Sequence, residues 1–241
     1  MRFGFEKENL EEFVSPAFQE NVRVKFHFEE EQTGLIREVA EELLPVLQRE
    51  AFWVRTAYIQ PAMQKESSQI RQACGAKNRQ SADVPDKAYE CVAMSLGHGV
   101  DQLQESYSEK GLLLQSYIVE ALTGELLMRG YDAYNRYIAS NTDWHVARYH
   151  FPGSEDSFPL EMLPELLQDL TQEITCNAAF CMIPKKSVVF ISELTQDETV
   201  RCQEICDGCG NTACPNRVGE NPLIRNTKNK ENTNGKFPSF F

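Results

Sequence analysis

The sequence has no run of about 18 apolar residues, the length that a helix needs to cross a membrane. Its first ten residues also lack a basic segment followed by an apolar one, so they do not resemble a secretory signal. We therefore expect a soluble, cytoplasmic protein with no membrane partner. The 241 residues suffice for one large domain or two small ones with a sizeable core.

Positive charge is scarce as well. The chain has 24 Lys and Arg residues against 36 Asp and Glu residues, which gives a formal net charge of −12. On average such a field repels polyanions, so we expect no nucleic-acid partner. The chain also lacks a nucleophile elbow, a phosphate-binding glycine loop and a zinc-hydrolase signature.

Cysteine is the residue type with the most distinctive spacing. Four of the eight cysteines follow the pattern C-x3-C-x2-C-x4-C: Cys202, Cys206, Cys209 and Cys214. In a chain without a secretion signal, such close spacing is more typical of metal binding than of disulfides, and Gly208 and Gly210 permit the tight turns it needs. We expect an iron–sulfur cluster or a zinc ion, and the compact run followed by proline slightly favours the cluster. A loop without metal is the alternative.

The first three of these cysteines also match the C-x3-C-x2-C triad of radical S-adenosylmethionine enzymes. In those enzymes the triad lies near the start of a barrel and leaves one iron open. Here the triad lies near the C-terminus, and Cys214 is available as a fourth ligand. We therefore reject a radical mechanism.

Hydrophobic patterns predict a mixture of strands and helices. Alternating or β-branched segments predict strands at 21–29, 52–59, 88–95, 143–151 and 187–194. Helical spacing predicts helices at 33–50, 99–108, 111–138 and 162–174, with Pro45 kinking or ending the first of them. The polar stretch 60–86 predicts a long loop with one short helix near Ile70. Because no regular βαβ repeat occurs, we expect an α+β fold.

The expected domain organisation has three parts. Residues 1–197 form one α+β domain, residues 198–217 form the cysteine-rich metal-binding segment, and residues 218–241 are too polar to order themselves. Among the scattered cysteines, three lie in apolar runs and are expected to be small buried side chains: Cys91, Cys176 and Cys181.

Several short segments occur in an order that resembles a known family. They are Ser95-Leu96-Gly97-His98-Gly99-Val100-Asp101, Glu120-Ala121-Leu122, Arg148 through Pro152-Gly153, Phe158-Pro159-Leu160-Glu161, Ile174 through Met182, and Pro184-Lys185-Lys186-Ser187-Val188. Over residues 85–195 they resemble the S-adenosylmethionine-binding reactivation domain of cobalamin-dependent methionine synthase, especially its free-standing, shorter members. The resemblance implies a twisted antiparallel sheet with flanking helices and a groove for S-adenosylmethionine.

The resemblance also implies a set of ligand-binding residues. These are Arg148, His150, Phe151, Gly153 and Glu120. In the family, an arginine that leads into a Pro-Gly-Tyr turn holds the methionine carboxylate, and Arg148 matches it; a guanidinium suits this task because it binds a carboxylate through two parallel hydrogen bonds. The backbone around His150 and Phe151 would line the groove. The chain departs from the family at Ser154, where the family has tyrosine, and by one extra residue before Pro159.

Structural roles are the alternatives for these residues. Arg148 would then be a strand-end arginine paired with a nearby acid, and Glu120 a solvated helix residue. His98 lies in a glycine-flanked turn that could approach a ligand, whereas His145 and His150 lie on a predicted strand. None of these histidines has a partner at metal-ligand spacing.

The resemblance implies an accessory role in corrinoid chemistry. Family domains present S-adenosylmethionine so that reduction and methyl transfer convert inactive cob(II)alamin into methylcobalamin. The chain has no Asp-x-His-x-x-Gly cobalt-ligand motif, so we expect a separate corrinoid-binding protein as its partner in trans. An iron–sulfur cluster at the four cysteines would then pass the electron. The alternative is a non-enzymatic interaction protein of the same fold with a structural zinc or iron–sulfur site.

Overall fold

The computed structural model describes residues 2–4, 7–57, 87–154, 158–197 and 199–200. The short helix predicted near Ile70, the four clustered cysteines and the predicted tail all lie outside the described residues.

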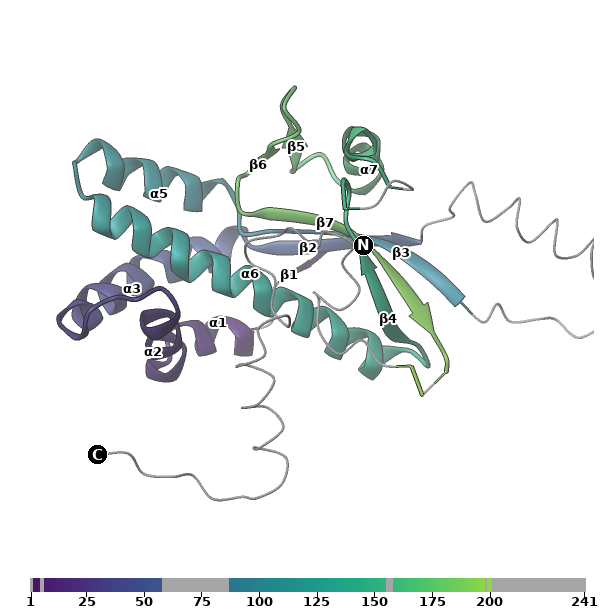
Figure 1. Ribbon diagram of the computed structural model, residues 1–241, viewed down its shortest axis with the longest axis horizontal. Helices are drawn as coiled ribbons and strands as arrows, with labels where there is room; N and C mark the ends of the chain where they lie inside the picture. Colours follow the sequence, from purple (N-terminus) through teal and green to yellow (C-terminus); the bar gives the residue numbers. More distant parts are fainter. Residues whose placement is uncertain (1, 5–6, 58–86, 155–157, 198, 201–241) are drawn as a thin grey trace, which may run out of the picture.

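Five strands of the described chain form an antiparallel sheet (Figure 1). Its strands, in spatial order, are β1 (Arg2–Gly4), β2 (Phe52–Ala57), β3 (Lys87–Ser95), β7 (Ser187–Thr195) and β4 (His145–His150). Each neighbouring pair is antiparallel, and β3 and β7 pair along their full length of nine residues. Two shorter strands, β5 (Thr175–Cys176) and β6 (Met182–Ile183), form a separate pair.

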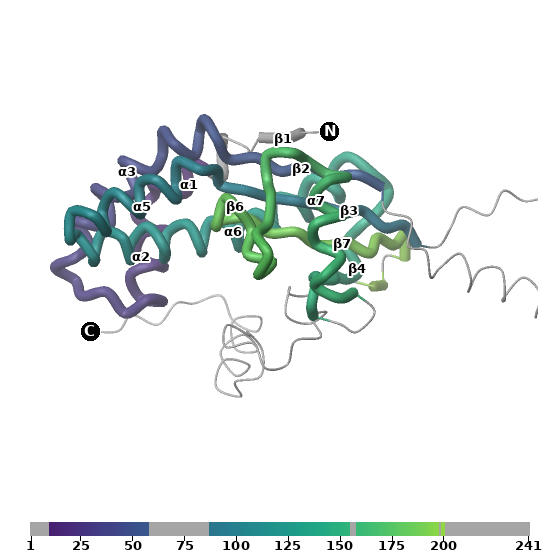
Figure 2. Tube along the Cα trace, turned by 90° about the horizontal axis from the view of Figure 1, so that it is seen from above, coloured from purple at the N-terminus to yellow at the C-terminus, as the bar shows by residue number. Residues whose placement is uncertain are grey.

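The helices divide between one end of the molecule and the two faces of the sheet (Figures 1 and 2). The group at one end consists of α1 (Lys7–Phe13), α2 (Pro16–Lys25), the 3-10 turn η1 (Glu30–Gln32), α3 (Thr33–Glu50), α5 (His98–Glu109) and the first half of α6 (Leu113–Asn141). The second half of α6 packs on one face of the sheet, and α7 (Leu163–Leu170), preceded by the turn η2 (Leu160–Met162), packs on the other. This arrangement confirms the predicted α+β class.

Three apolar cores follow from these layers. Side chains of the grouped helices form the first core, in which Ile118 and Leu122 of α6 take part. Further along α6, Tyr134 and Ile138 belong to a second core against the sheet. The third core lies under α7.

Among the described helices, none combines the length and apolar character that a membrane crossing requires.

The alternation of side chains along β3 and β7 assigns each residue to one face. The even-numbered Val92 and Phe190 lie in the core below α6, whereas the odd-numbered Cys91 and Val189 lie in the core below α7. The continuous register between the two strands preserves this alternation to their ends.

The predicted strand at 21–29 is wrong, because its first five residues belong to α2 and the other four form no strand. Ser15 caps this helix, its Oγ accepting a hydrogen bond from the Phe18 backbone N–H at 3.2 Å, and Pro16 occupies the first helical position. Phe18 and Val22 are buried one helical turn apart, whereas Val24 is 58% exposed. The alternation of apolar and polar residues in this segment therefore did not indicate a strand. The segment is helical, and only some of the alternating apolar side chains are buried.

The other predicted elements differ mainly at their ends. The expected strands at 52–59, 88–95, 143–151 and 187–194 correspond to β2, β3, β4 and β7. The helix at 33–50 runs through Pro45 without ending there. The predicted helix at 162–174 is shorter, since α7 stops at Leu170; Ile174 is buried, but it follows the helix.

The three scattered cysteines of the described chain differ in burial. Cys91 is buried on β3, and burial is the main reason that its pKa is raised to about 12. Cys176 is half-buried, and Cys181 is exposed, so the prediction that Cys181 is buried is wrong. The reason is local: the Asn177 side-chain oxygen accepts hydrogen bonds from the backbone N–H groups of Ala179 and Cys181, which forms a tight surface turn between β5 and β6.

Candidate ligand site

Five polar side chains from three adjacent strands share the α7 face of the sheet. We call this group the Glu193 patch: Lys87 and Tyr89 of β3, Glu193 of β7, and Arg148 and His150 of β4. Lys87, Tyr89 and Glu193 are odd-numbered and therefore lie on the same face as Cys91. Tyr149 packs on the α6 side, so its neighbours Arg148 and His150 lie on the α7 side.

Glu193 lies at the centre of this patch. In the strand register it is directly opposite Tyr89 on one side and Arg148 on the other. Its Oε1 is 2.6 Å from Lys87 Nζ, and its Oε2 is 3.5 Å from His150 Nε2. The Glu193 side chain is only 13% exposed, whereas that of Lys87 is 56% exposed.

The electrostatics of the patch keep Glu193 ionised. Burial alone would raise the pKa of Glu193, but the hydrogen bond and charge of Lys87, together with His150, outweigh burial and hold the pKa below its usual value. Conversely, the hydrogen bond to Glu193 raises the pKa of Lys87. The patch therefore carries one fixed carboxylate beside two permanent cations, Lys87 and Arg148.

A tight turn follows β4 at the edge of the patch. Gly153 has a positive φ of 80°, which favours glycine, and its N–H donates to the Phe158 carbonyl at 2.8 Å. Ser154 donates to the Phe151 carbonyl through its N–H at 3.0 Å and its Oγ at 2.7 Å, and its Oγ accepts from the Phe151 N–H at 3.3 Å. The residue that departs from the family pattern therefore closes this turn on the backbone of Phe151.

The Phe151 side chain points away from the patch. It packs on the α6 side against Tyr131, Tyr149 and Phe190, with ring centroids 6.1–6.4 Å apart. This packing anchors the turn to the sheet. Any contribution of Phe151 to a ligand on the α7 side would therefore come from its backbone.

Glu120 lies far from the other predicted ligand residues. It is on the first half of α6, where it pairs with Lys186 and accepts a hydrogen bond from Gln104 Nε2 at 3.1 Å. Lys186 directly precedes β7, and Glu193 lies near the other end of that strand. At roughly 3.3 Å per residue the two positions are about 23 Å apart. The structure thus brings Arg148, His150 and Gly153 together and places Glu120 elsewhere.

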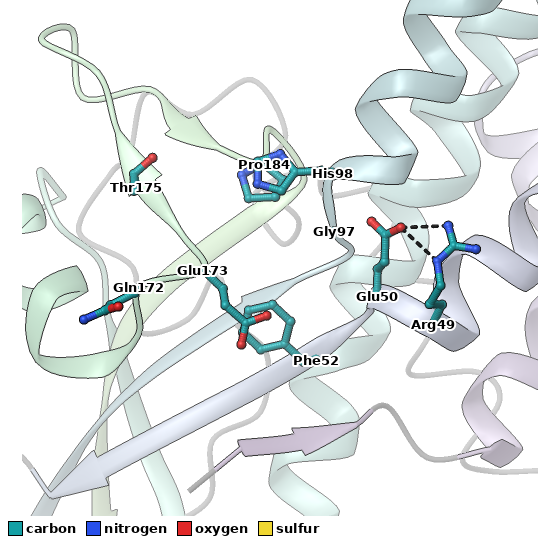
Figure 3. A pocket seen from close by; sticks show the side chains of 9 residues that line it. All are labelled: Arg49, Glu50, Phe52, Gly97, His98, Gln172, Glu173, Thr175 and Pro184. Atoms are coloured by element: carbon teal, nitrogen blue, oxygen red, sulfur yellow. Dashed lines mark hydrogen bonds and ion pairs between the residues drawn. The ribbon is translucent and has the colours of Figure 1, made fainter.

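The turn at His98 borders a cavity of about 420 Å³ between α3, α5, the segment after α7 and Pro184 (Figure 3). Glu50, at the end of α3, accepts a hydrogen bond from the Gly99 N–H at 2.6 Å and pairs with Arg49. A Cβ on Gly97 would lie 2.4 Å from the Glu50 Cβ. The glycines beside His98 thus allow α3 to approach α5, which is a structural reason for their presence.

A second polar group lies between the sheet and α6. The Glu90 carboxylate pairs with Arg55 and accepts a hydrogen bond from the Tyr134 hydroxyl at 3.0 Å, while the Arg55 guanidinium lies 5.0 Å from the Tyr137 ring centroid. Burial, followed by the charge of Glu90, raises the pKa of Tyr134. These contacts fix α6 on the sheet, so we assign them a structural role.

Sequence reasoning missed Glu193 and Lys87. Neither belongs to a local motif, and only the pairing of β3, β7 and β4 places them beside Arg148. The predicted metal ligands Cys202, Cys206 and Cys209, together with Cys214, lie outside the described residues. Within the described ranges, no group of three His, Cys, Asp or Glu side chains is placed to hold a metal ion.

Comparison with known proteins leaves the family of the chain open. No protein-family model matches the sequence, and no curated protein is similar enough to count as a match. The functional proposal therefore depends on the sequence resemblance and on the geometry around Arg148.

Proposed function

We propose that this protein binds S-adenosylmethionine and supports the reductive methylation of a corrinoid held by a separate protein. The observation that carries the proposal is the position of Arg148, on the α7 face of β4 and just before the glycine turn. In the resembling family an arginine at this place holds the methionine carboxylate. The antiparallel sheet with helices on both faces is compatible with that family.

The protein's contribution to such a reaction is positioning. One external electron reduces cob(II)alamin to cob(I)alamin, whose cobalt attacks the methyl carbon of S-adenosylmethionine; the carbon–sulfur bond breaks, giving methylcobalamin and S-adenosylhomocysteine. The cobalt is the nucleophile, so no side chain of this chain needs to be one. Arg148 would fix the amino-acid end of the methyl donor and thereby the direction of its methyl group.

The corrinoid would come from a partner protein, whose docking surface we expect to be basic. The net charge of −12 attracts a positive surface and accelerates encounter at low salt. Association should therefore weaken as ionic strength rises. The predicted cluster at Cys202, Cys206, Cys209 and Cys214, if it is an iron–sulfur cluster, would supply a route for the electron.

Calorimetric titration with S-adenosylmethionine tests the proposal directly. Replacing Arg148 by Ala removes a charge-assisted hydrogen-bond donor, which should weaken binding by about ten- to a hundredfold. Arg37→Ala, at an exposed position on α3, is the matched control and should bind as the wild type does. Equal affinity of the Arg148→Ala variant and the wild type would refute the role of Arg148, and no binding of the wild type at millimolar ligand would refute the proposal.

The methylation step needs its own assay. The protein is mixed with corrinoid proteins encoded beside it, a reductant and S-adenosylmethionine, and the cob(II)alamin spectrum is followed. Faster conversion to methylcobalamin than without the protein is the expected result. S-adenosylmethionine binding without acceleration for any such corrinoid protein would restrict the proposal to ligand binding.

A second candidate function is favoured by Ser154. The Ser154 hydroxyl hydrogen-bonds to the backbone N–H and carbonyl of Phe151. The turn is therefore closed by the Ser154 side chain and does not need a ligand to hold its shape. The chain would then be a non-enzymatic interaction protein with a structural metal at its cysteines. Absence of S-adenosylmethionine binding, together with a colourless purified protein that contains zinc, would favour this candidate; a brown protein with visible absorbance would indicate iron–sulfur.

A further inference from the structure

The Glu193 patch places opposite charges at neighbouring positions of the sheet. Arg148 and Glu193 are paired residues on adjacent strands, and their side chains project from the same face. Such directly opposed residues have Cβ atoms about 4.5–5.5 Å apart. The side chains of Arg148 and Glu193 therefore leave the sheet from adjacent positions, next to the register shift between Val146 and Arg148.

This arrangement complements the amino-acid end of a ligand. The α-carboxylate and α-ammonium groups of an amino acid are attached to one carbon, so they reach two adjacent sites of opposite charge at once. Arg148 provides the site for the carboxylate, and Glu193 provides an ionised acceptor for the ammonium. Since Glu193 is largely buried, its interaction with a cation is screened less than at an exposed position.

We propose that Glu193 binds the α-ammonium group of S-adenosylmethionine, and that the Lys87 ammonium occupies this position until the ligand displaces it. The inference rests on the proposed function and adds to it a specificity-determining residue and an internal competitor.

Lys87 has the properties of such a competitor. Its Nζ lies 2.6 Å from Glu193 Oε1, which shows that this oxygen accepts an ammonium group at normal hydrogen-bond distance. Lys87 is the first residue of β3 and is more than half exposed, so its flexible side chain can move into water at little cost. The exchange replaces one ammonium by another, and Glu193 never loses its counter-charge.

His150 complements this exchange by orienting the carboxylate. Its Nε2 lies 3.5 Å from the other oxygen of Glu193, and the His150 side chain is 18% exposed. One oxygen of the carboxylate therefore faces His150, and the other is left to the exchanging ammonium group.

The test compares S-adenosylmethionine with its desamino and decarboxylated analogues by calorimetry. We expect the wild type to bind the desamino analogue about ten- to a hundredfold more weakly than S-adenosylmethionine. Glu193→Gln should bind S-adenosylmethionine less than threefold more tightly than the desamino analogue. It should still prefer S-adenosylmethionine to the decarboxylated analogue as strongly as the wild type does. Glu161→Gln, at an exposed position in η2, is the control and should retain both preferences.

Lys87→Met tests the competitor separately. Removing the exposed ammonium group of Lys87 should tighten S-adenosylmethionine binding by about two- to fivefold, and the desamino analogue should bind no more tightly than it does to the wild type. Lys110→Met, at the exposed end of α5, should change neither affinity. Denaturant unfolding of each variant checks that its fold is retained.

The outcomes separate this inference from the proposed function. If the wild type binds S-adenosylmethionine but Glu193→Gln keeps the full preference for the amino group, Glu193 is not the ammonium site and the proposed function still holds. If Lys87→Met binds S-adenosylmethionine no more tightly than the wild type, Lys87 is not a competitor. If the wild type binds none of the three compounds, both the inference and the proposed function are overturned.

Discussion

Replacing Glu50 by Ala should destabilise the junction between α3 and α5. The N-cap residue of α5 is Gly97, which has no side chain to cap the helix, and the Glu50 carboxylate accepts from the Gly99 N–H instead, at 2.6 Å. Loss of a capping acceptor costs about 0.5–2 kcal/mol. Loss of a negative charge at a helix N-terminus costs about 0.3–1 kcal/mol more. We therefore expect Glu50→Ala to lower the free energy of unfolding by roughly 1–3 kcal/mol.

The hydrogen bond between Glu50 and the Gly99 N–H should also make the stability of the protein depend on pH. Burial alone would raise the pKa of Glu50, but the Gly99 N–H and the Arg49 guanidinium hold this pKa below its ordinary value of 4.5. A depressed pKa stabilises the fold above the unfolded-state value and loses that effect as pH falls through the folded-state value. The stability difference between wild type and Glu50→Ala should therefore be largest near neutral pH and shrink below about pH 4.5.

Urea unfolding at a series of pH values measures this difference. Glu41→Ala, at an exposed position on α3, is the control for the change in helix propensity and should lie within about 0.5 kcal/mol of the wild type. Glu50→Gln keeps a hydrogen-bond acceptor and should lose only the charge contribution, about 0.3–1 kcal/mol. A Glu50→Ala variant as stable as the Glu41→Ala control, or a difference that stays constant with pH, would refute the capping role.

Two further predictions concern the glycines and cysteines. Gly97→Ala should lower the free energy of unfolding by about 1–3 kcal/mol, because φ of Gly97 is +91° and the new Cβ would lie 2.4 Å from the Glu50 Cβ. Gly124→Ala, within α6 and with no atom in contact range of the new Cβ, should instead stabilise by about 0.5–1 kcal/mol; equal effects in urea unfolding would contradict this reasoning. Cys91, whose pKa is raised to about 12 by burial, should resist iodoacetamide in the native protein, whereas the exposed Cys181 should be alkylated; mass spectrometry showing Cys91 modified first would be inconsistent with the fold.

Local patterns sufficed for much of the fold. The long helices and the strands β2, β3 and β7 have strong periodicity or β-branched composition, so their existence was predictable and only their ends shifted. At residues 21–29 the alternation was misleading. The capping signal at Ser15 and Pro16, six residues upstream, would have indicated the helix correctly.

The candidate site was predictable only in part. Arg148 and the glycine turn are close in sequence, so a linear resemblance could identify them. Lys87, Glu193 and Arg148 come from three separate strands, and their proximity depends on strand order and register. The resemblance predicts Glu120 as a ligand residue together with Arg148, whereas its ion pair with Lys186 locates Glu120 at the end of β7 opposite to Glu193.

The helix α6 has a consequence for any attempt to divide this protein. Its first half is buried among the grouped helices and its second half against the sheet, while Thr123, buried between them, donates to the Val119 carbonyl at 2.6 Å and leaves no polar break. Neither the helical part nor the sheet part can unfold alone without removing packing contacts from the continuous 29-residue helix α6. Helical and sheet fragments expressed separately would each expose an apolar stripe to water, so we expect the two parts to fold and unfold as one cooperative unit.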